Sequence, residues 1–266
     1  MQDLELPVSS SKNTALVSAG SVLHTNASNF GIVSKSISIA FSNTYCVRIF
    51  YACVIVSIVS LIITACRWGW ADIQAIGARN VMQGWESARM VSDEQSWQRA
   101  VQRLYLAAEL DEENAVHFAD LGRAHEWRAL QYPIWTRQSK EFRTKAIQHY
   151  LQAVELRPTW GYLWAHYAYS KVLNKEFDAN TVIALDKAMT LAPWESEVQL
   201  KIIWIGLNLW DFLSEEMHGR LAQTISRSLA MQSLPTLRLL KRTGRTDIVR
   251  LLLDADQLSV FKDLTP

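Results

Sequence analysis

Histidine and carboxylate side chains gather in one stretch of the sequence at a spacing that could support chemistry. His117, Asp120, His125 and Glu126 follow one another closely. In a helix, steps of three and eight residues bring His117, Asp120 and His125 to neighbouring sides, and imidazole with carboxylate suits metal binding or acid–base work. The competing interpretation is that His125 fills a packing position and the other side chains are solvated. We favour packing, because no further ligand pattern accompanies these residues.

The remaining histidines and the familiar catalytic motifs add no chemistry. His149 and His166 could approach each other between helices, where packing or groove lining is the favoured interpretation. The sequence holds no P-loop, no G-x-S-x-G, no H-E-x-x-H and no paired-cysteine spacing. We therefore predict no catalytic residue, no metal, no cofactor and no enzymatic activity.

One cysteine lies in a pattern that resembles a lipid-attachment signal. The segment Ile63-Thr64-Ala65-Cys66 fits a loose bacterial lipobox, in which the chain is cut before the cysteine and the thiol is acylated. The leader would then be far longer than the ~15–30 residues of ordinary signal peptides. An uncleaved membrane anchor is the main prediction, and lipidation at Cys66 stays open as the alternative.

The elements that must position any site begin with a long apolar segment, Arg48 to Trp70. Eighteen uncharged residues separate Arg48 from Arg67. As a helix they span about 27 Å, close to the ~30 Å hydrocarbon core of a bilayer. Aromatic residues flank both ends, as in the belts at membrane interfaces. We predict a transmembrane anchor at 48–70, preceded by a disordered tail at 1–47.

The orientation of the anchor is only weakly determined by its flanking charges. Basic residues flank both sides almost equally, so the simplest arrangement is a cytoplasmic tail with the larger domain outside. In a bacterium this means a single-pass inner-membrane protein with a periplasmic domain.

Composition narrows the function classes of the large domain. The net charge of +1 gives no footprint for nucleic acid, which we therefore exclude as a partner. All three cysteines lie in or beside the apolar segment, so the domain after residue 70 has neither disulfides nor a zinc-type cluster.

An internal repeat organises the chain from residue 71 to 233. Three helical segments align, beginning at Ala100, Ala146 and Val182. Each has a large residue, then a small one, then a helix stop; the large residues are Leu104, Tyr150 and Leu185, and the small ones are Ala107, Ala153 and Ala188. The stops Pro158 and Pro193 are 35 residues apart, and about a dozen extra residues interrupt the preceding unit near Pro133.

This pattern resembles the tetratricopeptide repeat, whose period is ~34 residues. "HFADLGRAH" and "YLWAHYAYSK" match its first helix. The resemblance implies an all-α solenoid of about three helix pairs, closed by capping helices at 234–266 and split at Gly244. Together with the anchor, "RPTWGYLWA" and "PWESEVQ" are similar to the VpsP-type polysaccharide biosynthesis proteins, over roughly residues 50–255.

The repeat resemblance also implies a binding groove on the first helices of the units. Its predicted lining residues are Arg123, Glu126, Tyr162, Tyr169 and Trp204. Aromatic and charged side chains of this kind suit a protein segment, and their faces also allow a glycan contact. We assign Trp97, Trp164, Trp204 and Trp210 to positions where the repeats need bulk.

These resemblances imply a non-catalytic, membrane-anchored adaptor in bacterial exopolysaccharide biosynthesis or export. Its partners would be other proteins of the synthesis or export complex. Two alternatives remain: a lipoprotein with the same solenoid, and a glycan-active hydrolase with an unrecognised site.

Overall fold

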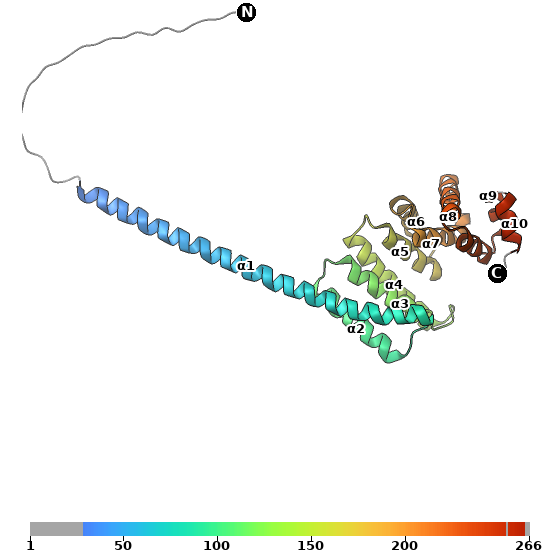
Figure 1. Ribbon diagram of the computed structural model, residues 1–266, viewed down its shortest axis with the longest axis horizontal. Coiled ribbons are helices and arrows are strands. Elements are labelled where there is room, and N and C mark those ends of the chain that lie inside the picture. Colours follow the sequence, from blue (N-terminus) through green and yellow to red (C-terminus); the bar gives the residue numbers. More distant parts are fainter. Residues whose placement is uncertain (1–28, 254, 264–266) are drawn as a thin grey trace, which may run out of the picture. The chain divides into compact units, whose positions relative to one another are not determined.

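The protein is built from helices alone over the part of the chain that the structure describes. The computed structural model describes residues 29–253 and 255–263. These contain α1 Asn29–Ala88, α2 Glu94–Leu110, α3 Ala115–Ala129, α4 Arg137–Leu156, α5 Gly161–Leu173, α6 Ala179–Leu191, α7 Ser196–Asn208, a 3-10 turn at Trp210–Phe212, α8 Glu215–Arg242, α9 Thr246–Leu252 and α10 Ala255–Asp263 (Figure 1). The predicted all-α class is confirmed.

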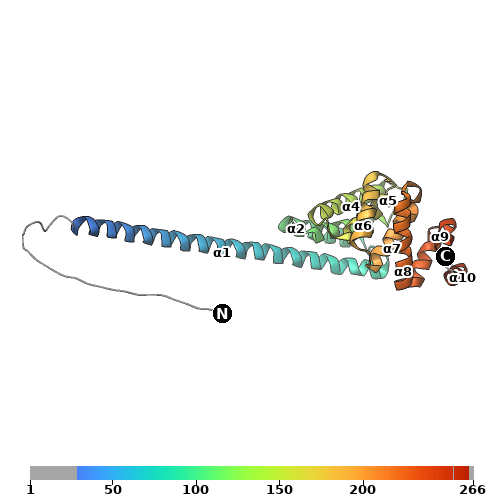
Figure 2. The same ribbon diagram turned by 90° about the horizontal axis from the view of Figure 1, so that it is seen from above.

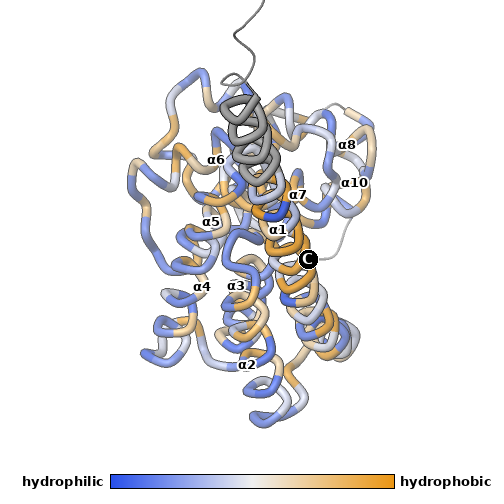
Figure 3. Tube along the Cα trace, turned by 90° about the vertical axis from the view of Figure 1, so that its left-hand side faces the viewer, coloured by the Kyte–Doolittle hydropathy of each residue, from blue (hydrophilic) through white to orange (hydrophobic). Residues whose placement is uncertain are grey.

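Helix α1 contains the apolar segment. It is long and apolar enough to cross a membrane, with a stretch of mean hydropathy 2.6 that has no buried residue. The hydrophobic colour runs along much of α1 in Figure 3. By length and composition, the prediction of a helix able to span a membrane is confirmed, and α1 is the one such helix among the described residues.

The structure differs from the sequence prediction at the start of this helix. Helix α1 begins at Asn29, whereas residues up to 47 were expected to be disordered. No proline interrupts positions 29–47, and extending an existing helix costs far less than starting one. Residues 1–28 of the predicted tail lie outside the described residues.

The chain divides into two compact units, residues 1–61 and residues 62–266. Successive helices of the second unit pack against one another from α2 to α8 (Figures 1 and 2). Short turns join them, and side chains at the turns fix where the helices begin. Asp93, Asn114, Thr136, Asp178 and Ser214 each accept a hydrogen bond from a backbone N–H in the first turn of the next helix. Such caps satisfy N–H groups that have no partner inside the helix.

The first helical hairpin is formed by the end of α1 and by α2. Five residues of α1 are fully buried in a core that they share with residues of α2 and α3: Ala71, Ala75, Ala78, Met82 and Trp85. Their spacing of four and three residues places them on one face of the helix. With α3–α4, α5–α6 and α7–α8 there are four such hairpins within 62–253. About three were expected. The first one was not recognised because its first helix is continuous with the apolar segment.

The aligned positions of the repeat meet in the core. All three large residues, Leu104, Tyr150 and Leu185, and all three small ones, Ala107, Ala153 and Ala188, are fully buried. Gly122 of α3 faces Tyr150 so closely that a Cβ there would lie 2.7 Å from the tyrosine ring. Small residues at these points allow the helices to approach.

The extra residues lie around the turn before α4, and the predicted boundary between residues 233 and 234 falls inside α8, next to its bend. The insertion becomes the 130–136 turn and a 20-residue α4, against 13 residues in α6. Helix α8 bends at Gln232, three residues before Pro235, which cannot donate a helical hydrogen bond. Gly244 has φ of 71° and separates α8 from α9, as predicted.

Candidate functional site

A groove of about 870 Å³ opens along the first helices of the four hairpins. Its wall combines residues of α1, α3, α5 and α7 with the turn between α3 and α4. All five residues predicted from the repeat pattern line it: Arg123, Glu126, Tyr162, Tyr169 and Trp204.

Glu126 is the carboxylate at the centre of a hydrogen-bond network in this groove. The Tyr150 hydroxyl donates to its Oε2 at 2.7 Å and the Ser170 hydroxyl to its Oε1 at 2.6 Å. The Nδ1 atom of His166 lies 3.5 Å from the same Oε2. Burial raises the pKa of Glu126, but the interaction with His166, the charge of Lys201 and the hydrogen bond from Ser170 outweigh it, so the pKa lies below the ordinary value. Glu126 is therefore ionised at neutral pH, although only 16% of its side chain is exposed.

Arg123 belongs to a second network that joins α3 to α1. Its guanidinium pairs with Glu86 and lies 3.7 Å from Asp120. Arg79 donates to Asp120 at 2.6 Å. These arginines are thus held by carboxylates of the same wall.

Three aromatic side chains also line the groove. Tyr162 and Tyr169 come from α5 and Trp204 from α7, and all three are half-buried. The rings of Tyr169 and Trp204 are 4.8 Å apart, and Tyr162 lies 4.2 Å from the His166 ring. Burial raises the pKa of both tyrosines to about 12, so their hydroxyls stay protonated.

The sequence reasoning missed the groove residues outside the aligned first helices. Arg79 and Glu86 lie on α1, which was assigned to the start of the domain without a role. Arg143 lies in the insertion and donates to Ser139, Asn174 and the Ile134 carbonyl. The spacing of four and three residues between the small and apolar residues from Ala71 to Trp85 is a sequence signal that could have indicated packing of α1 in the domain. The role of Arg143 has no signal in the sequence.

The histidine cluster near residue 120 does not match the expected solvated arrangement. His117, Asp120 and His125 are all buried. His125 stacks on His149, with the ring centroids 5.3 Å apart, and packs edge-on against Trp97. Within the described residues no group of three or more His, Cys, Asp or Glu could hold a metal ion. His125 fills a packing position as expected, but its neighbours are structural and not solvated.

The tryptophan assignments need one correction. Trp97 is buried, whereas Trp204 lines the groove and Trp210 stacks on His218 at 3.8 Å. Trp164 is only half-buried, and its ring N–H donates to the Pro158 carbonyl. The buried aromatic of α5 is Tyr167, because the packing face of this helix runs through Leu163, Tyr167 and Ala168.

Burial of neutral histidines predicts a loss of stability in mild acid. Burial lowers the pKa of His125 to about 3, and the pKa values of His117, His149 and His166 are lowered as well. The unfolded chain therefore binds protons from pH 6.5 downward while the folded chain does not. Stability is full above pH 6.5 and falls as the pH drops toward 3. Between pH 7.5 and 5.5 His125 contributes about 1 kcal/mol of this loss, and the three other histidines change the stability in the same direction.

Denaturant unfolding at the two pH values checks this, with His125→Phe as the comparison. The variant keeps an aromatic ring beside Trp97, and we expect its loss between pH 7.5 and 5.5 to be smaller by about 1 kcal/mol. Equal losses in both proteins would show that His125 is protonated in the folded state.

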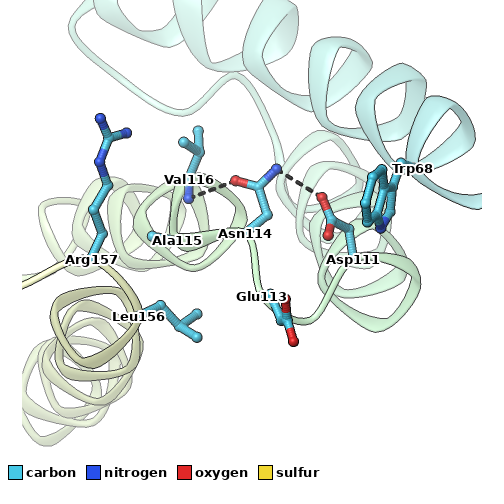
Figure 4. A pocket seen from close by; sticks show the side chains of 8 residues that line it. All are labelled: Trp68, Asp111, Glu113, Asn114, Ala115, Val116, Leu156 and Arg157. Atoms are coloured by element: carbon cyan, nitrogen blue, oxygen red, sulfur yellow. Dashed lines mark hydrogen bonds between the residues drawn. The ribbon is translucent and has the colours of Figure 1, made fainter. Parts of the chain in front are cut away.

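A second, smaller hollow of about 340 Å³ lies at the turn between α2 and α3 (Figure 4). The Asn114 amide there donates to Asp111 at 2.9 Å and accepts from the Val116 N–H. Trp68 of α1 stands beside Asp111 in this view. Cys66, the candidate lipidation residue, is exposed two positions earlier on the same helix.

Comparison with known proteins adds no relative: neither the protein-family models nor the curated proteins give a match to this chain.

Proposed function

We propose that this chain is a membrane-anchored, tetratricopeptide-like adaptor that binds a segment of a partner protein in its groove. The observation that carries the proposal is the convergence of all five predicted lining residues on one groove. The fully buried alignment of the repeat positions and the four successive hairpins support a repeat of this type. Grooves with half-buried aromatic residues beside charged ones suit extended segments or helices of proteins.

The proposed setting is bacterial exopolysaccharide synthesis or export, at the inner membrane with the domain in the periplasm. Its support is the sequence likeness in "RPTWGYLWA" and "PWESEVQ" together with an N-terminal apolar helix. Anchoring would hold the groove at the membrane, where it raises the effective concentration of partners in the same complex. The activity is binding, and none of the groove residues is assigned a catalytic step.

Paired alanine variants test whether the groove captures partners. Tyr169→Ala and Trp204→Ala each remove a half-buried ring, and we expect either to weaken capture by about 2 kcal/mol if the ring is a binding hot spot. Trp194→Ala is the matched control, since this tryptophan is 64% exposed and is not part of the groove. The measurement is recovery of synthesis and export proteins by the full chain from detergent extracts, beside exopolysaccharide yield in cells carrying each variant.

The outcome separates the two parts of the proposal. Unchanged recovery in both groove variants, with normal melting, contradicts binding through the groove. Loss of recovery without any change in exopolysaccharide contradicts the proposed setting while leaving the adaptor intact.

The lipoprotein alternative rests on the exposed Cys66. Intact mass of the purified protein distinguishes it from the uncleaved anchor. A mature chain that begins at Cys66 and carries added acyl mass would replace the anchor in the proposal.

A further inference from the structure

Glu126 brings a negative charge into the groove that no permanent cation of the described residues contacts. Its oxygens accept hydrogen bonds from the neutral hydroxyls of Tyr150 and Ser170. The one ion-pair distance it makes within this part of the chain is to His166, whose pKa is lowered by burial, so that the imidazole is neutral at pH 7. A carboxylate that is mostly removed from water and lacks a cationic partner is a costly arrangement.

Aromatic faces flank this charge. Tyr162, Tyr169 and Trp204 line the same groove as Glu126 and are half-buried in the absence of a partner. The face of an aromatic ring carries the negative part of its quadrupole, so it attracts a cation placed over it. The carboxylate of Glu126 and the aromatic rings therefore both favour a positively charged ligand group.

Lys201 shows this preference within the molecule. Its Nζ lies 5.3 Å from the centre of the Tyr169 ring. It lines the groove and its positive charge acts on Glu126, but it has no carboxylate at ion-pair distance within the described chain. Lys201 is thus a cation that shares the site without an ion pair among the described residues.

The arginines of the groove do not offer an equivalent place for an anion. Arg79 and Arg123 are held by Asp120 and Glu86. Arg143 is buried and already donates to three neutral acceptors. An acidic ligand near the centre of the groove would instead meet Glu126.

We propose that the groove receives a lysine or arginine side chain of a partner segment, seated on Glu126 between Tyr162, Tyr169 and Trp204. This inference rests on the proposed function and names the chemistry of its partner. The incoming cation displaces Lys201 from the site, because two like charges repel over the same rings. Lys201 therefore acts as an internal competitor of the partner's basic side chain.

The two charged residues give variants whose effects have opposite signs. The probes are three fluorescent peptides of equal length. Alanine alternates with lysine in the first, with glutamate in the second and with serine in the third. The full chain is held in nanodiscs of neutral phosphatidylcholine, and empty discs correct for adsorption. Fluorescence polarisation reports each Kd. We expect the Lys peptide to bind roughly tenfold more tightly than the Ser peptide and the Glu peptide to bind most weakly.

The Glu126→Gln variant should lose most of the tenfold preference for the Lys peptide over the Ser peptide. The Lys201→Gln variant should bind the Lys peptide more tightly, with a Kd lower by about threefold. Glu126→Gln keeps an acceptor for the buried hydroxyls. Lys201→Gln changes a side chain outside the core, so the Lys201 variant remains informative even if the Glu126 variant unfolds. Weaker binding of the Lys peptide to Lys201→Gln, or preference for the Glu peptide, overturns the basic-side-chain inference alone. Absence of binding by all three peptides up to about 1 mM overturns it together with the proposed groove function.

Discussion

Replacing Tyr150 by alanine is expected to unfold the central hairpins. The side chain is fully buried, and its ring lies against Gly122 while its hydroxyl donates to Glu126. Removing a buried aromatic ring costs about 3–5 kcal/mol, and a further buried acceptor loses one of its donors. For a domain of this size we expect the melting temperature to fall by roughly 10 °C. Thermal unfolding followed by circular dichroism in detergent measures it.

Two companion variants divide this effect into its parts. Tyr150→Phe keeps the ring and removes only the hydroxyl, so it should cost about 1–2 kcal/mol. Tyr169→Ala removes a half-buried ring from the groove and should cost clearly less than Tyr150→Ala. If the two alanine variants melt alike, the distinction between the core and the groove face of these helices is wrong.

Replacing Trp85 by alanine is expected to detach the first hairpin. Trp85 is the largest fully buried side chain of α1, and its ring N–H donates to the Ser96 hydroxyl of α2 at 3.2 Å. The loss should again be about 3–5 kcal/mol. Because α2 then loses the hydrogen bond of Ser96 to Trp85 and part of the core that it shares with α1, its amides should exchange with deuterium faster than those of α5, which hydrogen-exchange mass spectrometry measures.

Trp135→Ala is the matched control for this experiment. Trp135 is 84% exposed in the turn between α3 and α4, so its removal should leave both melting and exchange unchanged. Uniformly faster exchange across α2 to α8 in Trp85→Ala would contradict a local detachment and indicate that the hairpins unfold as one unit.

The sequence predicted those elements in which the helix breaks and the spacing of apolar residues agree with the packing in the fold. Prolines marked turns, and the alignment of Tyr150 with Leu104 and Leu185 identified core positions that are fully buried. The groove residues came from the resemblance to the tetratricopeptide repeat, which implies a lining on the first helix of each unit; Tyr162 and Tyr169 lie seven residues apart on α5 and face the same side. Periodicity and repeat spacing were sufficient for the buried positions, and the groove positions needed the resemblance.

Other features depend on contacts that periodicity does not encode. Trp164 has the size of a core residue, but Tyr167 and not Trp164 lies on the packing face. Asp120 is buried because Arg79 reaches it from α1, a pairing across 41 residues that no local pattern reveals. The first hairpin was hidden because its first helix continues, without a break, from a segment whose composition suggested a separate anchor.

That continuity has a consequence for proteolytic release. Arg79 and Glu86, which line one side of the groove, belong to the same helix as the apolar segment, and the first turn after it lies at 89–93. Proteases cut exposed turns more readily than helices, since a helical backbone must first unfold locally. A cut at Arg89 or Met90 would break the covalent link between α1 and α2, and any fragment of α2 to α10 that then dissociated would leave these side chains behind. The released fragment would lack one wall of its groove. Proteolytic release at this turn would therefore abolish binding and would not produce a soluble fragment that still binds the partner.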